Sequence, residues 1–367
     1  MKPQDDKDKV KTENDTEIKS EESMNTPKRK LPFYRSLLPW KGDSKKLVVN
    51  KVISLVAGCV FLVCAVLLIQ DLVVLPAIAD NEQKDIKQLY YASSELPSSS
   101  TSSSSEAPVS SAPPERDAQG RLIKFLDLQK VNPAIVGWIK VPNTIIDLPV
   151  LQATAKDPEF YLTHDYNDKY SKYGSVFADW HSSVEKGNSK SIILYGHSLN
   201  SGRMFTELNK YKDYNFYKSN PVFTFDTIES QSQWKIISVF LTNTLPDQGV
   251  PFNYMKTDFK TSSDYLNFVY QMRIRSLFNT GVSFNKDDQI VLLSTCSYEF
   301  TDFREVVVAR KVRDGESNAV DVTKMSYNNK VVYPDCWYKK NGGTKPVWPD
   351  TYELALKKKA LPWGEGV

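Results

Sequence analysis

The sequence predicts a mostly β protein of the α+β class: an antiparallel barrel or sandwich with peripheral helices, preceded by one membrane-spanning helix. Two observations predict it. An uncharged apolar run, residues 52–69, interrupts a polar N-terminal region. After about residue 118, short apolar runs of strand length recur with turn signals between them, and only a few stretches show helical spacing.

Length and composition exclude several classes of protein. The chain has 367 residues, 41% of them hydrophobic and 25% charged, as in an ordinary folded protein. Its formal net charge of +3 provides no basic surface for nucleic acid, so we expect no nucleic-acid partner. The four Cys and three His are too few and too scattered for a zinc module or a disulfide-rich scaffold.

The N-terminal region predicts a membrane anchor. Residues 1–51 form a cytoplasmic tail that is predicted to be disordered, because its opening stretch mixes Lys, Asp and Glu without hydrophobic periodicity. Residues 52–75 are the signal-anchor; the apolar part would make about 27 Å of helix, close to one hydrocarbon core. The run is too long and too far from residue 1 for a cleaved signal peptide. A buried core helix is the alternative, and the lack of a polar face disfavours it.

The charges on either side of this anchor predict its orientation. Eight basic residues precede it, opposed nearby only by Asp43, whereas four acidic residues and two lysines follow it. The basic side stays in the cytoplasm, so we expect a single-pass type II protein of the cell membrane with an extracellular catalytic part. Residues 76–117 are the predicted extracellular linker, because the Ser/Pro tract at 93–114 cannot bury apolar surface.

Residues 118–313 form the predicted folded domain. Apolar residues at helical spacing predict a short helix over 122–128, which ends before Asn132-Pro133. Two strands flank Pro142-Asn143-Thr144 and predict a hairpin. The predicted strands are Val136–Val141, Ile145–Val150, Gly174–Ala178, Ser191–Gly196, Val222–Asp226, Trp234–Thr242, Gln289–Thr295 and Glu305–Val312, and the further helices are Met204–Tyr211 and Asp264–Phe278.

The cysteines fall into two pairs. Cys59 and Cys64 lie in the apolar run, where they are small apolar fillers. Cys296 and Cys336 lie beyond it, where an oxidising exterior permits a disulfide between them. Cys296 directly follows an apolar run, however, and a side chain at the end of a barrel strand is accessible to substrate. This position favours a reactive thiol, and the disulfide stays open as the alternative.

Two other side chains are candidates to act with Cys296. If the strands around residues 297–303 pair as a hairpin, Arg304 lies across the ladder from Cys296. A guanidinium there would favour the thiolate or stabilise a carbonyl oxygen that gains charge; a solvated strand-edge charge is the alternative. His197 also ends an apolar run, and a thiol and an imidazole at strand ends can work as nucleophile and acid–base pair. His164 and His181 lie in polar, loop-like stretches and are expected to be solvated.

The residues around these positions resemble the motifs of the sortases. Leu293-Ser294-Thr295-Cys296, followed by Arg304, resembles the active-site signature of that family, and Tyr195-Gly196-His197 resembles its histidine motif. Residues 132–139, 146–150 and 174–179 are similar to the start of class B domains, and the long helix before the cysteine strand also fits class B. The resemblance covers about residues 118–313, with the motifs in the expected order.

This resemblance implies an eight-stranded β-barrel and a cysteine transpeptidase of Gram-positive cell surfaces. Cys296 would attack the carbonyl at the Thr of a C-terminal sorting signal, and an amine of the peptidoglycan precursor would resolve the thioacyl-enzyme and so anchor the surface protein. His197 would donate and accept protons, and Arg304 would hold the sorting signal or stabilise the oxyanion. No cofactor is implied. No acidic cluster indicates the calcium site of some class A members, so no metal is expected.

Three serine and threonine side chains are candidate substrate contacts: Ser294, Thr295 and Ser198. Ser294 lies two residues before Cys296 and therefore on the same face of the strand, with core packing as the alternative. Ser198 stands where many class B members carry Asn.

Other functions stay open. A class B-type pilus polymerase would join pilins through a lysine amine, and the sequence does not distinguish that acceptor from the cell wall. A catalytically silent surface scaffold would keep the barrel, although the joint presence of Cys296, His197 and Arg304 disfavours it. An unrelated cysteine hydrolase would usually show a His oriented by Asp or Asn.

Residues 314–367 form a predicted C-terminal extension. Its three Trp and four Tyr disfavour disorder. One hypothesis is a lobe or strap packed on the barrel, and the other is a lid near the active site or a docking surface for pilin or wall glycan.

Overall fold

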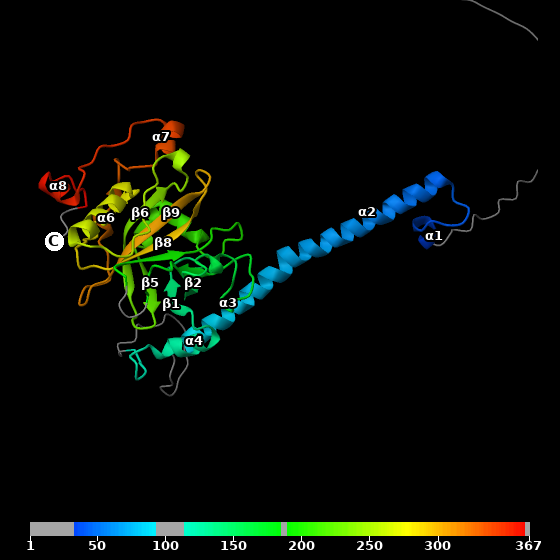
Figure 1. Cartoon of the computed structure of the whole chain (residues 1–367), viewed down its shortest axis with the longest axis horizontal. Helices are drawn as coiled ribbons and strands as arrows, with labels where there is room; N and C mark the ends of the chain where they lie inside the picture. Colours follow the sequence, from blue (N-terminus) through cyan, green and yellow to red (C-terminus); the bar gives the residue numbers. More distant parts are fainter. Residues whose placement is uncertain (1–32, 93–113, 185–188, 364–367) are drawn as a thin grey trace, which may run out of the picture. The chain divides into compact units, whose positions relative to one another are not determined.

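The computed structural model describes residues 33–92, 114–184 and 189–363 (Figure 1). The chain divides into two compact units, residues 1–78 and 79–367. In the first unit, α1 (Phe33–Leu37) precedes α2 (Lys45–Ile69), and Ser44 caps α2 by accepting a hydrogen bond from the Leu47 backbone N–H. None of the 25 residues of α2, all of which the structure describes, is buried. The helical run Lys45–Ala92 is long and apolar enough to cross a membrane, as expected for the anchor.

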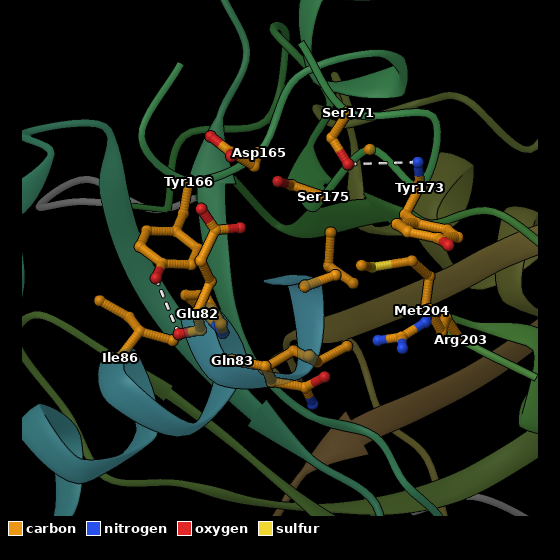
Figure 2. Close-up of a pocket in the computed structure, with 15 residues that line it drawn as sticks. Glu82, Gln83, Ile86, Asp165, Tyr166, Ser171, Tyr173, Ser175, Arg203 and Met204 are labelled. Atoms are coloured by element: carbon orange, nitrogen blue, oxygen red, sulfur yellow. Dashed lines mark hydrogen bonds between the residues drawn. The ribbon is translucent and has the colours of Figure 1, made fainter. Parts of the chain in front are cut away.

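After η1 (Gln70–Val74), α3 (Leu75–Ala92) enters the second unit at Ala79. Tyr90 of α3 is buried, stacks on Trp138 at 4.2 Å and donates a hydrogen bond to the Asp226 carboxylate at 2.6 Å. Tyr166 donates to the Glu82 carbonyl beside a small cavity between α3 and the barrel (Figure 2). The prediction of an extracellular linker over residues 76–117 is therefore wrong for its first part, because residues 79–92 form a helix that packs on the barrel. The Ser/Pro tract lies outside the described residues, apart from Pro114.

Eight strands close into a barrel in the order β1-β2-β3-β4-β8-β9-β6-β5, as the resemblance implied. The barrel is mixed rather than antiparallel, because β2 pairs with β3, and β4 with β8, in parallel after long connections. The predicted hairpin of β1 and β2 is confirmed. The strands are β1 Ile135–Lys140, β2 Asp147–Gln152, β3 Val176–Ala178, β4 Ser191–Tyr195, β5 Val222–Thr227, β6 Gln233–Thr242, β8 Ile290–Ser297 and β9 Phe303–Lys311, while β7 (Phe278–Asn279) and β10 (Ser326–Tyr327) form a separate small sheet.

Short helices fill the connections. The predicted helix at 204–211 is the 3₁₀ helix η4 (Thr206–Lys212), and the predicted helix at 264–278 is α6 (Ser262–Arg275), which ends earlier because its last predicted residue belongs to β7. Thr261 caps α6 by accepting from the Asp264 N–H. The others are η2 Ile123–Phe125, α4 Leu126–Val131, η3 Phe160–Leu162, α5 Tyr214–Ser219, η5 Pro246–Gln248, η6 Val322–Lys324, α7 Asp335–Asn341 and α8 Tyr352–Lys357.

The side chains of β8 alternate between two hydrophobic cores. Val291 and Leu293 belong to the core that includes η4 and β1, whereas Ile290 and Leu292 belong to the core beneath α6. Because successive strand residues point to opposite faces, Ser294 continues the α6 side of β8, and Thr295 continues the other side.

The described part of the C-terminal extension packs on the barrel unit. Helix α8 lies beside α6 (Figure 1), and Ala355 of α8 is buried with Tyr270 and Ile274 of α6. Trp337 of α7 lies 6.2 Å, centroid to centroid, from Phe300 in the loop between β8 and β9. This arrangement corresponds to the predicted strap, and no described residue of the extension lines the cavity considered next.

Candidate active site

A cavity of about 600 Å³ lies where β4 and β8 end. Its lining comes from β3 and the segments on both sides of it, from the end of β4 and the segment after it, from the segment after β6, from the end of β8 and from the start of β9. Cys296, His197 and Arg304 all line it, so the structure brings together the three residues that the sequence singled out.

Cys296 is the last residue but one of β8. It pairs with Arg304 of β9 in the antiparallel ladder, as the sequence predicted. Its thiol is free and partly exposed, and the Cys336 thiol is also free, so the alternative disulfide is not formed. The guanidinium of Arg304 donates to the Phe303 carbonyl at 3.1 Å, and no described carboxylate forms an ion pair with it. Arg304 is therefore a cation at the rim that forms no ion pair with the part of the chain that the structure describes.

His197 follows β4 after one glycine. A Cβ at Gly196 would lie 2.7 Å from the ring of Phe205, so only glycine lets the chain pass this ring. The Nε2 atom of His197 lies 2.8 Å from the Leu162 carbonyl oxygen. A carbonyl oxygen only accepts, so Nε2 carries a proton and donates it. In the neutral ring, Nδ1 is then the nitrogen that exchanges a proton.

Hydroxyl groups link the strand ends that carry these residues. Thr295 donates to the Gly196 carbonyl at 2.8 Å, which ties β8 to the turn before His197. The Ser294 hydroxyl and the Tyr254 hydroxyl lie 2.9 Å apart and are buried. Burial raises the pKa of Tyr254, and the hydrogen bond with Ser294 and the charge of Arg304 act against that rise. Ser294 and Thr295 thus line the cavity, but each hydroxyl already has a protein partner.

The prediction for Ser198 is wrong as far as the cavity is concerned. Its side chain is buried, its hydroxyl accepts a hydrogen bond from the Asn209 amide at 3.3 Å, and it does not line the cavity. The backbone next to it is held by a hydrogen bond of 2.9 Å from the Phe205 N–H to the His197 carbonyl.

Sequence reasoning missed other residues of the cavity. Tyr254 lies in an irregular segment after β6, where no periodicity marks it. His181, which was expected to be a solvated loop residue, lines the cavity, and its Nδ1 lies 2.9 Å from the Asp179 carboxylate. The Asp-x-His spacing was the available signal, since an acidic residue two positions before a histidine can reach its ring.

One buried acid lies directly behind the site. Glu305 follows Arg304 and pairs with Thr295 in the ladder, so its side chain points to the opposite face from Cys296. Neither of its carboxylate oxygens has a hydrogen-bond partner among the described residues, and the Lys212 Nζ is 4.0 Å away. Burial raises the pKa of Glu305 to about 8, so it is mostly protonated at neutral pH.

A thiol, an imidazole and a guanidinium on one rim of a closed β-barrel define a cysteine enzyme of the acyl-transfer type. The family model described as a sortase domain matches residues 139–312. Sortase B of Listeria monocytogenes is 34% identical over 173 residues, which are 47% of this chain and 67% of that protein. Sortase B of Staphylococcus aureus is 34% identical over 192 residues, which are 52% of this chain and 75% of that protein.

A solved structure shows that the similarity extends to the fold. Sortase B from Bacillus anthracis in complex with AAEK2 is 30% identical, with 65% of this chain and 97% of that chain covered and a TM-score of 0.53. The chain therefore belongs to the sortase family, with class B sortases as its relatives, and sortases are cysteine transpeptidases. The family and the enzyme class that the motifs implied are thus confirmed.

Proposed function

We propose that this sortase cleaves a C-terminal sorting signal after Thr and transfers the surface protein to an amine of a Gram-positive peptidoglycan precursor. Cys296 is the nucleophile, His197 the acid and base, and Arg304 the group that stabilises the oxyanion or holds the signal. One observation carries this proposal: the three residues line one cavity, with Arg304 opposite Cys296 in the ladder.

The first half-reaction forms a thioacyl-enzyme. The Cys296 thiol first passes its proton to Nδ1 of His197. The thiolate then attacks the carbonyl carbon of the Thr, and the guanidinium of Arg304 stabilises the oxygen that gains charge. The C–N bond then breaks, and His197 gives the proton of Nδ1 to the leaving amine. In the second half-reaction, an acceptor amine attacks the thioester, His197 takes a proton, and the C–S bond breaks.

We also propose that the protein is anchored with its N-terminus in the cytoplasm and its catalytic unit outside. The long apolar helix and the excess of basic residues before it support this orientation. Extracellular protease added to intact cells is expected to remove the catalytic unit and leave a fragment protected inside. A catalytic unit that is cut only after lysis would contradict it.

A fluorogenic peptide assay tests the reaction. The full chain in detergent micelles is incubated with a panel of sorting-signal peptides, with and without an amine, beside Cys296→Ala. We expect cleavage and an amine-dependent ligated product that both vanish in the variant, and a thioacyl adduct on Cys296 by mass spectrometry. Comparing a peptidoglycan stem amine with a pilin lysine peptide separates wall anchoring from pilus polymerisation. No adduct with any peptide, and no labelling of Cys296 by a thiol reagent, would instead indicate a silent scaffold.

A further inference from the structure

A second histidine lies on the same cavity as Cys296 and His197. His181 follows β3, and its imidazole is held on one side by the Asp179 carboxylate and on another by Trp180, whose ring centroid is 3.5 Å away. Asp179 is largely buried, and its second carboxylate oxygen accepts a hydrogen bond from Tyr195 at 3.0 Å. The imidazole itself is about half exposed, at 53%. The pair is thus an oriented histidine that faces solvent at the cavity.

The cavity of about 600 Å³, rather than the strand register, connects this pair with the nucleophile. The Asp179 N–H donates to the Ile193 carbonyl, and Ile193 pairs with Leu292 on β8. Asp179 therefore lies two strands from β8, about 10 Å at the usual strand spacing, and level with a residue four positions before Cys296. His181 and Cys296 line the same cavity, so a ligand that fills it passes both.

The hydrogen bond to Asp179 fixes the tautomer of His181. An ionised carboxylate only accepts, so the Nδ1 atom of His181 carries the proton. No described residue bonds to Nε2, which is therefore free to accept a proton. This is the reverse of His197, whose Nε2 is committed to a carbonyl and whose Nδ1 is free.

The incoming amine must lose two protons during transfer, and a second base would take one of them. A primary alkylamine is protonated at neutral pH, and it loses two protons when its nitrogen becomes an amide. The neutral His197 takes one proton as the amide C–N bond forms and the Cys296 thiolate leaves. The other proton must leave the ammonium before it attacks, and His197 cannot hold both.

We propose that His181, oriented by Asp179, is the base that takes this first proton from the incoming ammonium, so that the rim beside β3 is the acceptor side of the site. This inference rests on the proposed transpeptidase reaction. The proton then passes from His181 to water. The Asp179 carboxylate and the exposed ring of Trp180 are groups that attract a primary ammonium before it is deprotonated. The other titratable or charged groups on the cavity are Glu159, Tyr195, His197, Tyr254, Cys296 and Arg304.

Two acceptors of different protonation state test this role. Ethylamine is protonated at neutral pH, whereas hydroxylamine is not and needs no base before attack. With the full chain in detergent micelles, His181→Gln is expected to lower transfer to ethylamine about 10²-fold and to leave transfer to hydroxylamine and the rate of thioacyl formation nearly unchanged. Asp179→Asn, which removes the acceptor that fixes the tautomer, is expected to lower ethylamine transfer in the same selective way.

His164→Gln is the matched control. The His164 ring stacks on Phe160 at 3.8 Å, its Nδ1 lies 2.8 Å from the Phe160 carbonyl, and it does not line the cavity. Both transfers should be unchanged in this variant. Equal losses with both amines in His181→Gln, or no loss with ethylamine, would overturn the inference. Absence of a thioacyl adduct in the unmodified protein would be a different result, because it would remove the proposed reaction itself.

Discussion

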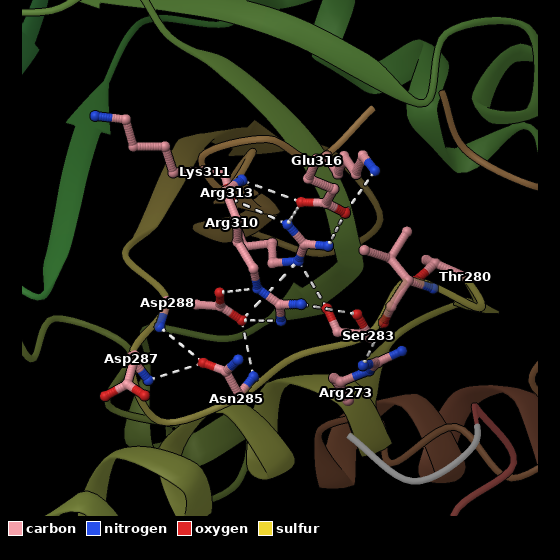
Figure 3. Close-up of polar contacts among 12 residues, drawn as sticks. Arg273, Thr280, Ser283, Asn285, Asp287, Asp288, Arg310, Lys311, Arg313 and Glu316 are labelled. Carbon is pink, nitrogen blue, oxygen red and sulfur yellow. Dashed lines mark hydrogen bonds and ion pairs between the residues drawn. The ribbon is translucent and has the colours of Figure 1, made fainter. Parts of the chain in front are cut away.

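Each end of the β8–β9 hairpin carries an arginine, and the two arginines differ in whether a carboxylate pairs with them. At one end, Arg310 pairs with Ile290 in the ladder, is 1% exposed and donates two hydrogen bonds of 2.7 Å to the Glu316 carboxylate (Figure 3). At the other end, Arg304 pairs with Cys296 at an open cavity and has no carboxylate partner among the described residues. The comparison separates an arginine that holds the fold from one that is left available for a ligand.

The paired end is a network rather than a single ion pair. Arg313 binds Asp288 at 2.6 Å (Figure 3), and Lys235 binds Glu316 at 2.7 Å. The hydrogen bonds from Arg310 hold the pKa of Glu316 far below its usual range. Buried charges persist in a protein when they are paired and hydrogen-bonded, and this end meets that condition. At the Cys296 end, Arg304 is only partly buried and faces the cavity, so its charge is open to solvent and available to the proposed substrate.

Removing the arginine of the paired end gives the largest expected effect. Arg310→Met leaves Glu316 partly buried without its main partner, and breaking a buried pair in this way costs about 3–5 kcal/mol of unfolding free energy. Urea denaturation of the detergent-solubilised chain measures this loss, and peptide cleavage per folded molecule should not change. Lys286→Met is the control, because Lys286 forms only an exposed pair with Asp287. If Arg310→Met lost no more unfolding free energy than Lys286→Met, the proposed difference between the two ends of the hairpin would be wrong.

The matching change at the open end should affect activity and not stability. Arg304→Ala is expected to lower kcat/KM for peptide cleavage by about 10²–10³-fold, because it removes the group proposed to stabilise the oxyanion. Its unfolding free energy should stay within about 0.5 kcal/mol of the unmodified protein. Arg304→Lys should recover only part of the activity, since an ammonium lacks the planar fork of donors. Large destabilisation in Arg304→Ala would mean that this arginine is structural after all.

The sequence predicted this end of the hairpin well and the surroundings less well. The sequence predicted the positions of Cys296, Arg304 and His197 because each lies next to a continuous apolar run. Such a run shows where a buried strand begins and ends. The number and spacing of such runs predicted a barrel or a sandwich, and the resemblance to the sortases implied the eight-stranded barrel. The parallel pairs were missed, since pairing across long connections depends on contacts that local patterns do not carry.

Two other errors have the same physical origin. The packing of α3 rests on Tyr90, Trp138 and Asp226, which are distant in sequence and meet only in the fold. The Ser/Pro tract beside α3 favoured a linker instead. His181 and Tyr254 were missed because they lie in irregular segments, where the neighbours that hold a side chain are set by tertiary structure.

Glu305 extends the comparison to a buried carboxylic acid that has no hydrogen-bond partner among the described residues. Its pKa of about 8 in the folded state lies above its ordinary value of 4.5, so between these values the folded state holds a proton that the unfolded chain releases. Its stabilising effect is complete below pH 4.5 and is lost as the pH rises through 8. We expect Glu305→Gln to reduce the fall in unfolding free energy between pH 5 and pH 8 by about 3 kcal/mol. Parallel pH curves for the two proteins would show that the folded state does not raise the pKa of Glu305.

The smallest expected effect compares two buried serines at opposite ends of the parallel β4–β8 pair. Ser294 bonds the Tyr254 hydroxyl beside the cavity, whereas the Ser191 hydroxyl, opposite Ile290, has no partner among the described residues. Ser294→Ala should cost about 1 kcal/mol, since it leaves the buried Tyr254 hydroxyl without that bond, and should lower kcat/KM about fivefold or less. Ser191→Ala should be neutral or stabilising, because a buried hydroxyl without a partner costs free energy. Thermal unfolding and peptide cleavage of both variants measure this difference, and equal losses in the two would contradict it. The polar groups of the cavity end would then hold their positions through backbone packing alone, without help from the hydroxyl network.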